Sequence, residues 1–212
     1  DYSGMILIEG EDAMKIKSRK KAEKIGFLSQ NHFAGYGFSV HDVIGLGGYA
    51  KASLFSQSEA EKEKKILEAA EKTGIQDLLS SSILTLSGGE LQRTFLAQLF
   101  MQEPDILVLD EPTNHLDIGY QYQVMQILKR QNVTVFSAVH DMNIAAYYCD
   151  RIIMLKKGKV VKIGTPEEVL TAERIQEVFG IRCNVTRNER TGRLQITYEP
   201  ASGDNVWEQK PV

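Results

Sequence analysis

The chain lacks long apolar runs, has few cysteines and carries little net charge. None of its 212 residues belongs to a run approaching the roughly 18 consecutive apolar residues that a membrane-spanning helix needs. The two cysteines, Cys149 and Cys183, lack metal-binding spacing and predict no disulfide scaffold, which is typical of a reducing compartment. The net charge of −3 gives no indication of nucleic-acid binding. The first residues, DYSGMILIEGED, match neither a signal peptide nor a transit peptide.

The sequence also lacks the usual phosphate-binding loop, because no G-x-x-x-x-G-K-[S/T] pattern occurs in it. The stretch Gly45-Leu46-Gly47-Gly48 is rich in glycine, but no apolar strand precedes it, so a turn is expected there. The composition, 42% hydrophobic and 25% charged, is typical of one globular domain.

The motifs that could carry chemistry are concentrated in residues 86–117, LSGGELQRTFLAQLFMQEPDILVLDEPTNHLD. Ser87 and Glu90 form a capping-box pattern, which predicts a helix from about Glu90 to Gln102. Gly88 and Gly89 would let a phosphate approach the backbone, and the helix N-terminus favours negative charge. Taken alone, this pattern predicts only a well-capped helix.

An apolar strand and two acids follow that helix. Ile106–Leu109 reads as a strand buried on both faces, in an α/β sheet. Asp110 and Glu111 come at its carboxyl end, where open α/β sheets bind ligands. Asp110 is a candidate holder of Mg²⁺ through water, and Glu111 a candidate general base. Pro112 favours an extended conformation at Glu111. The alternative is an acidic turn without function.

Two more strands end in polar side chains. The strand 25–29 leads to Gln30, whose amide could ligate a metal ion, and the strand 133–139 leads to His140. A neutral imidazole can donate a hydrogen bond to a phosphate oxygen. Taken alone, Gln30 is more simply a polar residue that begins a loop, and His140 a residue that ends a strand.

The order of these motifs resembles the ATPase subunits of ABC transporters, over about residues 4–180. LSGGE is similar to the family signature and ILVLDE to the Walker B strand. Gln30 is similar to the Q-loop glutamine, His140 to the H-loop histidine, and Leu116-Asp117 to the D-loop. The resemblance implies an α/β fold, a P-loop NTPase (RecA-like) cassette core with a helical subdomain at about residues 31–103. The cassette would span residues 1–180, followed by a hairpin and tail over 181–212.

The resemblance also implies the site. ATP and Mg²⁺ are the expected ligands, with Gln30 and Asp110 at the metal and Glu111 and His140 catalytic. Nucleotide contacts are expected from a further set: Gln30, Ser87, Gly88, Gly89, Glu90 and Asp117. In the family the signature closes over the nucleotide of a second ATPase subunit, which implies a dimer. Because no Walker A sequence is present, we expect an N-terminally truncated cassette that binds ATP very weakly and does not hydrolyse it alone.

Within the family, the chain is most similar to subunits that drive import of iron chelates, haem or cobalamin. SVHDVIGLGGYA, DEPTNHLD and HDMNIAAYYCDRIIMLKKGKVVKIGTPEEVL are the similar stretches. Gly48 departs from the pattern, which usually has arginine there. The resemblance implies a polytopic permease partner that docks near residues 31–54, at the cytoplasmic face of the membrane. No nucleic acid is expected.

Two alternatives come from other classes. Soluble ABC proteins of the ribosome also carry LSGGE and EPTNHLD, but they usually read HDRxFL where this chain has His140-Asp141-Met142-Asn143. They also have two cassettes, whereas this chain has one signature. A DNA-repair ATPase would need a long coiled coil before the signature, for which there is no room.

The remaining pattern predicts further elements around these motifs. Expected strands and hairpins are 5–9, 151–163 about Lys157-Gly158, and 183–199 about residues 189–192; expected helices are 39–45, 58–73, 118–130, 142–149, 165–168 and 173–179, with 12–24 helix-prone.

Overall fold

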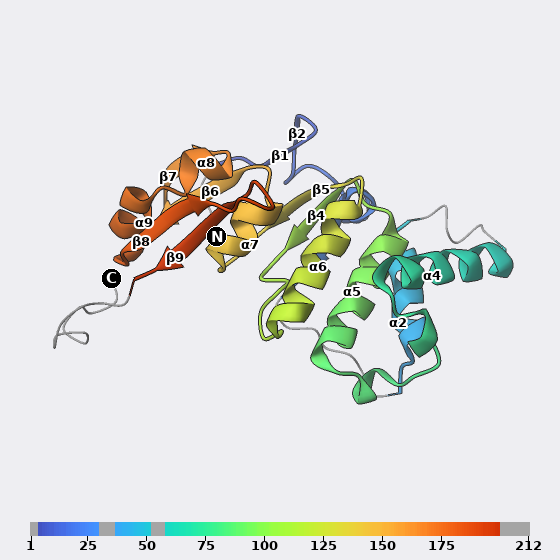
Figure 1. Cartoon of the computed structure of the whole chain (residues 1–212). Helices are drawn as coiled ribbons and strands as arrows, with labels where there is room; N and C mark the ends of the chain where they lie inside the picture. Colours follow the sequence, from blue (N-terminus) through green and yellow to red (C-terminus); the bar gives the residue numbers. More distant parts are fainter. Residues whose placement is uncertain (1–3, 30–36, 52–57, 200–212) are drawn as a thin grey trace. The chain divides into compact units, whose positions relative to one another are not determined.

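The computed structural model describes residues 4–29, 37–51 and 58–199 and divides the chain into two compact units, residues 1–138 and 139–212 (Figure 1). Each unit is described by itself. Gln30 and the stretch to residue 36 lie outside the described residues.

A three-stranded parallel sheet forms the centre of the first unit. Its order is β3 (Ile25–Leu28), β4 (Ile106–Leu109) and β5 (Thr134–Ser137). Leu28 pairs with Leu109, and Leu109 with Ser137, so the three strands end at the same edge. The predicted α/β arrangement is confirmed, although β5 is shorter than the strand expected over residues 133–139.

The two faces of this sheet differ in burial. Leu28, Leu107 and Leu109 point to a buried face, where α5 packs against β3. On the other face, Phe27 is 61% and Phe136 60% exposed, and both pair with the half-buried Val108. The prediction that β4 is buried on both faces is therefore wrong for the described structure, because only alternate residues of the strand meet a packed layer.

The N-terminal segment forms a hairpin instead of one strand. β1 (Leu7–Ile8) pairs antiparallel with β2 (Glu11–Asp12). Glu9 and Gly10 both have positive φ, 52° and 83°, which suits a tight two-residue turn whose twist matches the strands. This turn shortens the strand expected at residues 5–9, and the helix α1 (Ser18–Lys24) begins well after residue 12.

Helices occupy most of the chain between β3 and β4. The long helix α5 packs against both α2 and α4 (Figure 1). Gly47 lies so close to α5 that an added Cβ would stand 2.0 Å from the carbonyl oxygen of Gln98. Only a residue without a side chain therefore fits at this position. The elements are α2 (Val40–Leu46), the 3-10 helix η1 (Gly47–Ala50), α4 (Glu59–Thr73), the 3-10 helices η2 (Gln76–Leu78) and η3 (Ile83–Thr85), and α5 (Gly88–Gln102).

Helix α6 (Ile118–Arg130) completes the described helices of the first unit after β4. Among all the described residues, no helix is both long and apolar enough to cross a bilayer.

The second unit has its own core. The predicted hairpin beyond residue 180 packs into the same core as the helices before it, since Ile196 joins Ile175 and Met154 there. The domain boundary near residue 180 stays a prediction. The elements are α7 (Met142–Tyr148), β6 (Ile152–Lys156), β7 (Lys159–Gly164), α8 (Pro166–Val169), α9 (Ala172–Phe179), β8 (Cys183–Arg187) and β9 (Leu194–Tyr198).

Candidate functional site

The shared edge of the three strands positions the two acids. The backbone N–H of Asp110 donates to the carbonyl of Leu28 over 2.9 Å, so Asp110 lies beside the end of β3. Ser29 is the last described residue there, and Gln30 follows it in the sequence. Asp110 is exposed, whereas Glu111 is half-buried. The parallel register thus brings the end of the predicted Q-loop strand next to the predicted metal-binding carboxylate.

Glu111 has an unusual backbone conformation. Its φ of 51° lies in the left-handed region, so the expectation that Pro112 would keep it extended is wrong. A tight turn begins at this residue, because the N–H of Asn114 donates to the carbonyl of Glu111 over 3.0 Å. The side-chain amide of Asn114 also donates to Oε2 of Glu111 over 2.7 Å. The carboxylate is therefore held by Asn114 of the same loop.

Two glutamines fix this turn to the flanking helices. Gln92 of α5 donates its side-chain amide to the carbonyl of Pro112 over 2.9 Å. Gln121 of α6 donates to the carbonyls of Thr113 and Leu116 over 3.2 and 3.0 Å. No local signal in the sequence marks these two contacts, because each glutamine has polar neighbours in its helix, such as Arg93 beside Gln92 and Gln123 near Gln121.

The capping box at Ser87 is formed as predicted. Ser87 is the N-cap of α5, and its N–H and hydroxyl donate to Oε2 of Glu90 over 2.8 and 2.7 Å. Hydrogen bonds from the hydroxyl and then the N–H of Ser87 lower the pKa of Glu90 below its ordinary value. The two polar side chains of the signature therefore bind each other in this state.

The two signature glycines have different surroundings. Gly88 is exposed at the start of α5, with only Leu116 Cδ2 within reach of an added Cβ, at 3.9 Å. Gly89 is buried, and its added Cβ would stand 2.6 Å from Cδ1 of Tyr120. The guanidinium of Arg93 lies over the same Tyr120 ring, 5.8 Å from its centroid. Gly88 thus offers an open helix start, whereas Gly89 has a packing role within the chain.

The D-loop and H-loop residues begin helices. Asp117 is the N-cap of α6, and its Oδ1 accepts from the N–H of Tyr120 over 3.1 Å. His140 belongs to the second unit, where it is exposed and precedes Asp141, the N-cap of α7. The structure therefore gathers Asp110 and Glu111 at the strand edge of the first unit, and it describes His140 separately.

The metal-binding capacity of this edge is modest. Within the described ranges, no group of three or more His, Cys, Asp or Glu side chains could hold a metal ion. Mg²⁺ bound with a nucleotide needs only one or two protein carboxylates, because phosphates and waters supply its other ligands. The exposed carboxylate of Asp110 fits that requirement.

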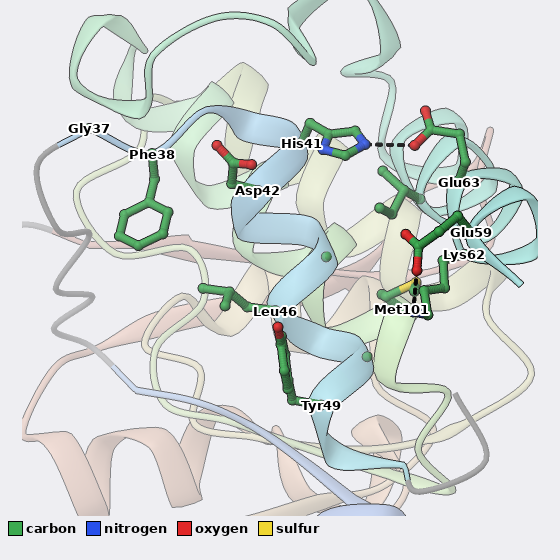
Figure 2. A pocket seen from close by; sticks show the side chains of 13 residues that line it. Gly37, Phe38, His41, Asp42, Leu46, Tyr49, Glu59, Lys62, Glu63 and Met101 are labelled. Atoms are coloured by element: carbon green, nitrogen blue, oxygen red, sulfur yellow. Dashed lines mark hydrogen bonds and ion pairs between the residues drawn. The ribbon is translucent and has the colours of Figure 1, made fainter. Parts of the chain in front are cut away.

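A groove lies between α2 and α4 (Figure 2). Its cavity volume is about 690 Å³, and Phe38, Leu46 and Tyr49 are exposed on it. A hydrogen bond and an ion pair mark its rim: His41 Nε2 lies 2.7 Å from Glu63 Oε2, and Lys62 Nζ lies 2.6 Å from Glu59 Oε1. An apolar floor with a charged rim suits a protein partner.

Comparisons with known proteins show which family the chain is similar to. The family described as ABC transporter matches residues 1–114. The ferric enterobactin transport ATP-binding protein of Escherichia coli (strain K12) is 36% identical over 86% of this chain and 69% of its own length. The hemin import ATP-binding protein of Plesiomonas shigelloides is 33% identical over 92% and 80%. A dimeric ATP-binding cassette, MJ0796, solved in a post-hydrolysis state with ADP and Pi, has a TM-score of 0.68 and 26% identity, covering 77% and 74%.

Proposed function

Because the chain belongs to the ABC transporter family, we propose that it is the main part of the ATP-binding and ATP-hydrolysing subunit of an importer for an iron chelate, haem or cobalamin-type substrate. The observation that carries the proposal is the parallel register, which sets Asp110 and Glu111 beside the end of the strand that leads to Gln30. The relatives are transport proteins, which supports the importer over the ribosomal alternative.

In this proposal each side chain has one role. Asp110 would hold Mg²⁺ through water, with Gln30 as a second ligand, and the ion would neutralise charge on the phosphates. Glu111 orients and deprotonates the attacking water, and His140 donates a hydrogen bond to the γ-phosphate. The start of α5 at Ser87 and Gly88 contacts the triphosphate held by a second ATPase subunit, with Asp117 nearby.

The groove between α2 and α4 is the proposed docking face for a polytopic permease, which places the subunit at the cytoplasmic face of the membrane. Its exposed Phe38, Leu46 and Tyr49 would receive the apolar side of a short helix. The conformational change that follows ATP hydrolysis at the strand edge would then be transmitted to the permease through the helices that line the groove.

The test uses the full-length subunit reconstituted with its permease. Glu111→Gln should lower ATP turnover by about a hundredfold or more, since general bases contribute that much, while ATP binding persists. The measurement is phosphate release together with uptake of labelled ferric siderophore, haem or cobalamin. Near-normal turnover of this variant would remove the role given to Glu111, and co-purification with ribosomes instead of a permease would contradict the importer.

A further inference from the structure

The turn that carries Glu111 is strained and closely held. A glutamate at φ 51° is sterically disfavoured, and such conformations persist only where their surroundings fix them. The backbone bond from Asn114 to the Glu111 carbonyl closes the turn, and the Asn114 amide holds the carboxylate at 2.7 Å. The carboxylate is thus directed by its own loop.

The loop is anchored in turn to the helix that begins with the signature. Pro112 and Thr113 are buried, and Gln92 reaches the Pro112 carbonyl from α5. Gln92 lies one helical turn after Gly88, on the same face of α5. Because Gly89 packs directly on the Tyr120 ring, the first turn of α5 has little room to move without its neighbours.

We propose that Gln92 and Asn114 are positioning residues, and that Gln92 links the signature turn of this chain to the Glu111 carboxylate of the same chain. The inference rests on the proposed function, in which the signature turn serves the partner's nucleotide and Glu111 serves the chain's own. A shift of α5 on nucleotide contact is transmitted through the Gln92–Pro112 bond to the strained turn, so each site controls the carboxylate of the other.

The test exchanges donors for acceptors of equal size in the full-length protein. Gln92→Glu removes the donor to Pro112, and Asn114→Asp removes the donor to Glu111 while keeping the oxygen that accepts from the N–H of His115 over 3.0 Å. Each change should lower kcat at least about tenfold, as misplaced catalytic groups do, with KM for ATP within about twofold. Gln123→Glu, the same change at an exposed position of α6, is the matched control and should leave kcat unchanged.

A second measurement separates positioning from simple destabilisation. Hydrogen exchange at the Asn114 amide, which bonds the Glu111 carbonyl, should speed up in Gln92→Glu while exchange in the core of α5 stays slow. In a Glu111→Gln background, neither substitution should reduce the residual turnover further.

The outcomes are distinguishable. Unchanged kcat and unchanged exchange in both variants, with an active parent, would overturn the inference and leave the proposed function intact. An equal loss of turnover in the Glu111→Gln background would also overturn it, because the residues would then act without that carboxylate. A parent that does not hydrolyse ATP with its permease would refute the proposed function itself.

Discussion

Helices α4 and α5 begin with the same capping box, but the burial of their first turns differs. In α4, the N–H of Ser58 donates to Glu61 over 2.8 Å, which equals the distance from Ser87 to Glu90 in α5. Residues 58–61 at the start of α4 are exposed, whereas the first turn of α5 has Gly89 buried against Tyr120. The capping box therefore specifies where a helix begins, and the neighbouring glycines and contacts decide whether that start can serve as a site.

Gly89→Ala should give the largest effect on stability. The new methyl would overlap the Tyr120 ring, so the ring or the helix must shift, at a typical cost of about 1–3 kcal/mol for overpacking. Chemical unfolding of the chain measures this cost. Gly88→Ala is the control, because its added Cβ meets nothing closer than 3.9 Å and should change stability little. Equal stability of both variants would mean that Gly89 is not packed as described.

Removing the N-cap hydroxyl of each helix should have a smaller effect on stability and tests whether the two helix starts differ in function. Ser58→Ala and Ser87→Ala should each cost about 1 kcal/mol of stability, because both caps accept a backbone N–H of the first turn. Only Ser87→Ala should also lower ATP turnover in the full-length protein, by about tenfold, the value of one hydrogen bond to a charged group. If Ser58→Ala lowers turnover as much, the signature serine has no special role.

Local patterns in the sequence predicted much of this structure. The capping box at Ser87 and the helix starts near Ser58 and Thr165 were predicted from the sequence and are confirmed, as is the hairpin about Lys157-Gly158. These features depend on neighbouring residues, whose chemistry the sequence displays directly.

Two of the missed features depend on partners far along the chain. The contact of Gly89 with Tyr120 and the bond from Gln92 to Pro112 appear only once α5, the acidic loop and α6 are packed together. A third, the left-handed conformation of Glu111, contradicts the local bias of the following proline. The roles of Gln30, His140 and Asp117 toward a nucleotide stay predictions.

The central claim is that the open start of α5 meets the nucleotide of a second copy. The most direct measurement is sedimentation of the full-length Glu111→Gln protein with ATP, compared with the same protein carrying Gly88→Glu, which places a carboxylate at the start of α5. We predict an ATP-dependent dimer that Gly88→Glu converts to a folded monomer, because like charges repel. A dimer equally stable with Gly88→Glu, or no dimer with ATP at all, would contradict the claim.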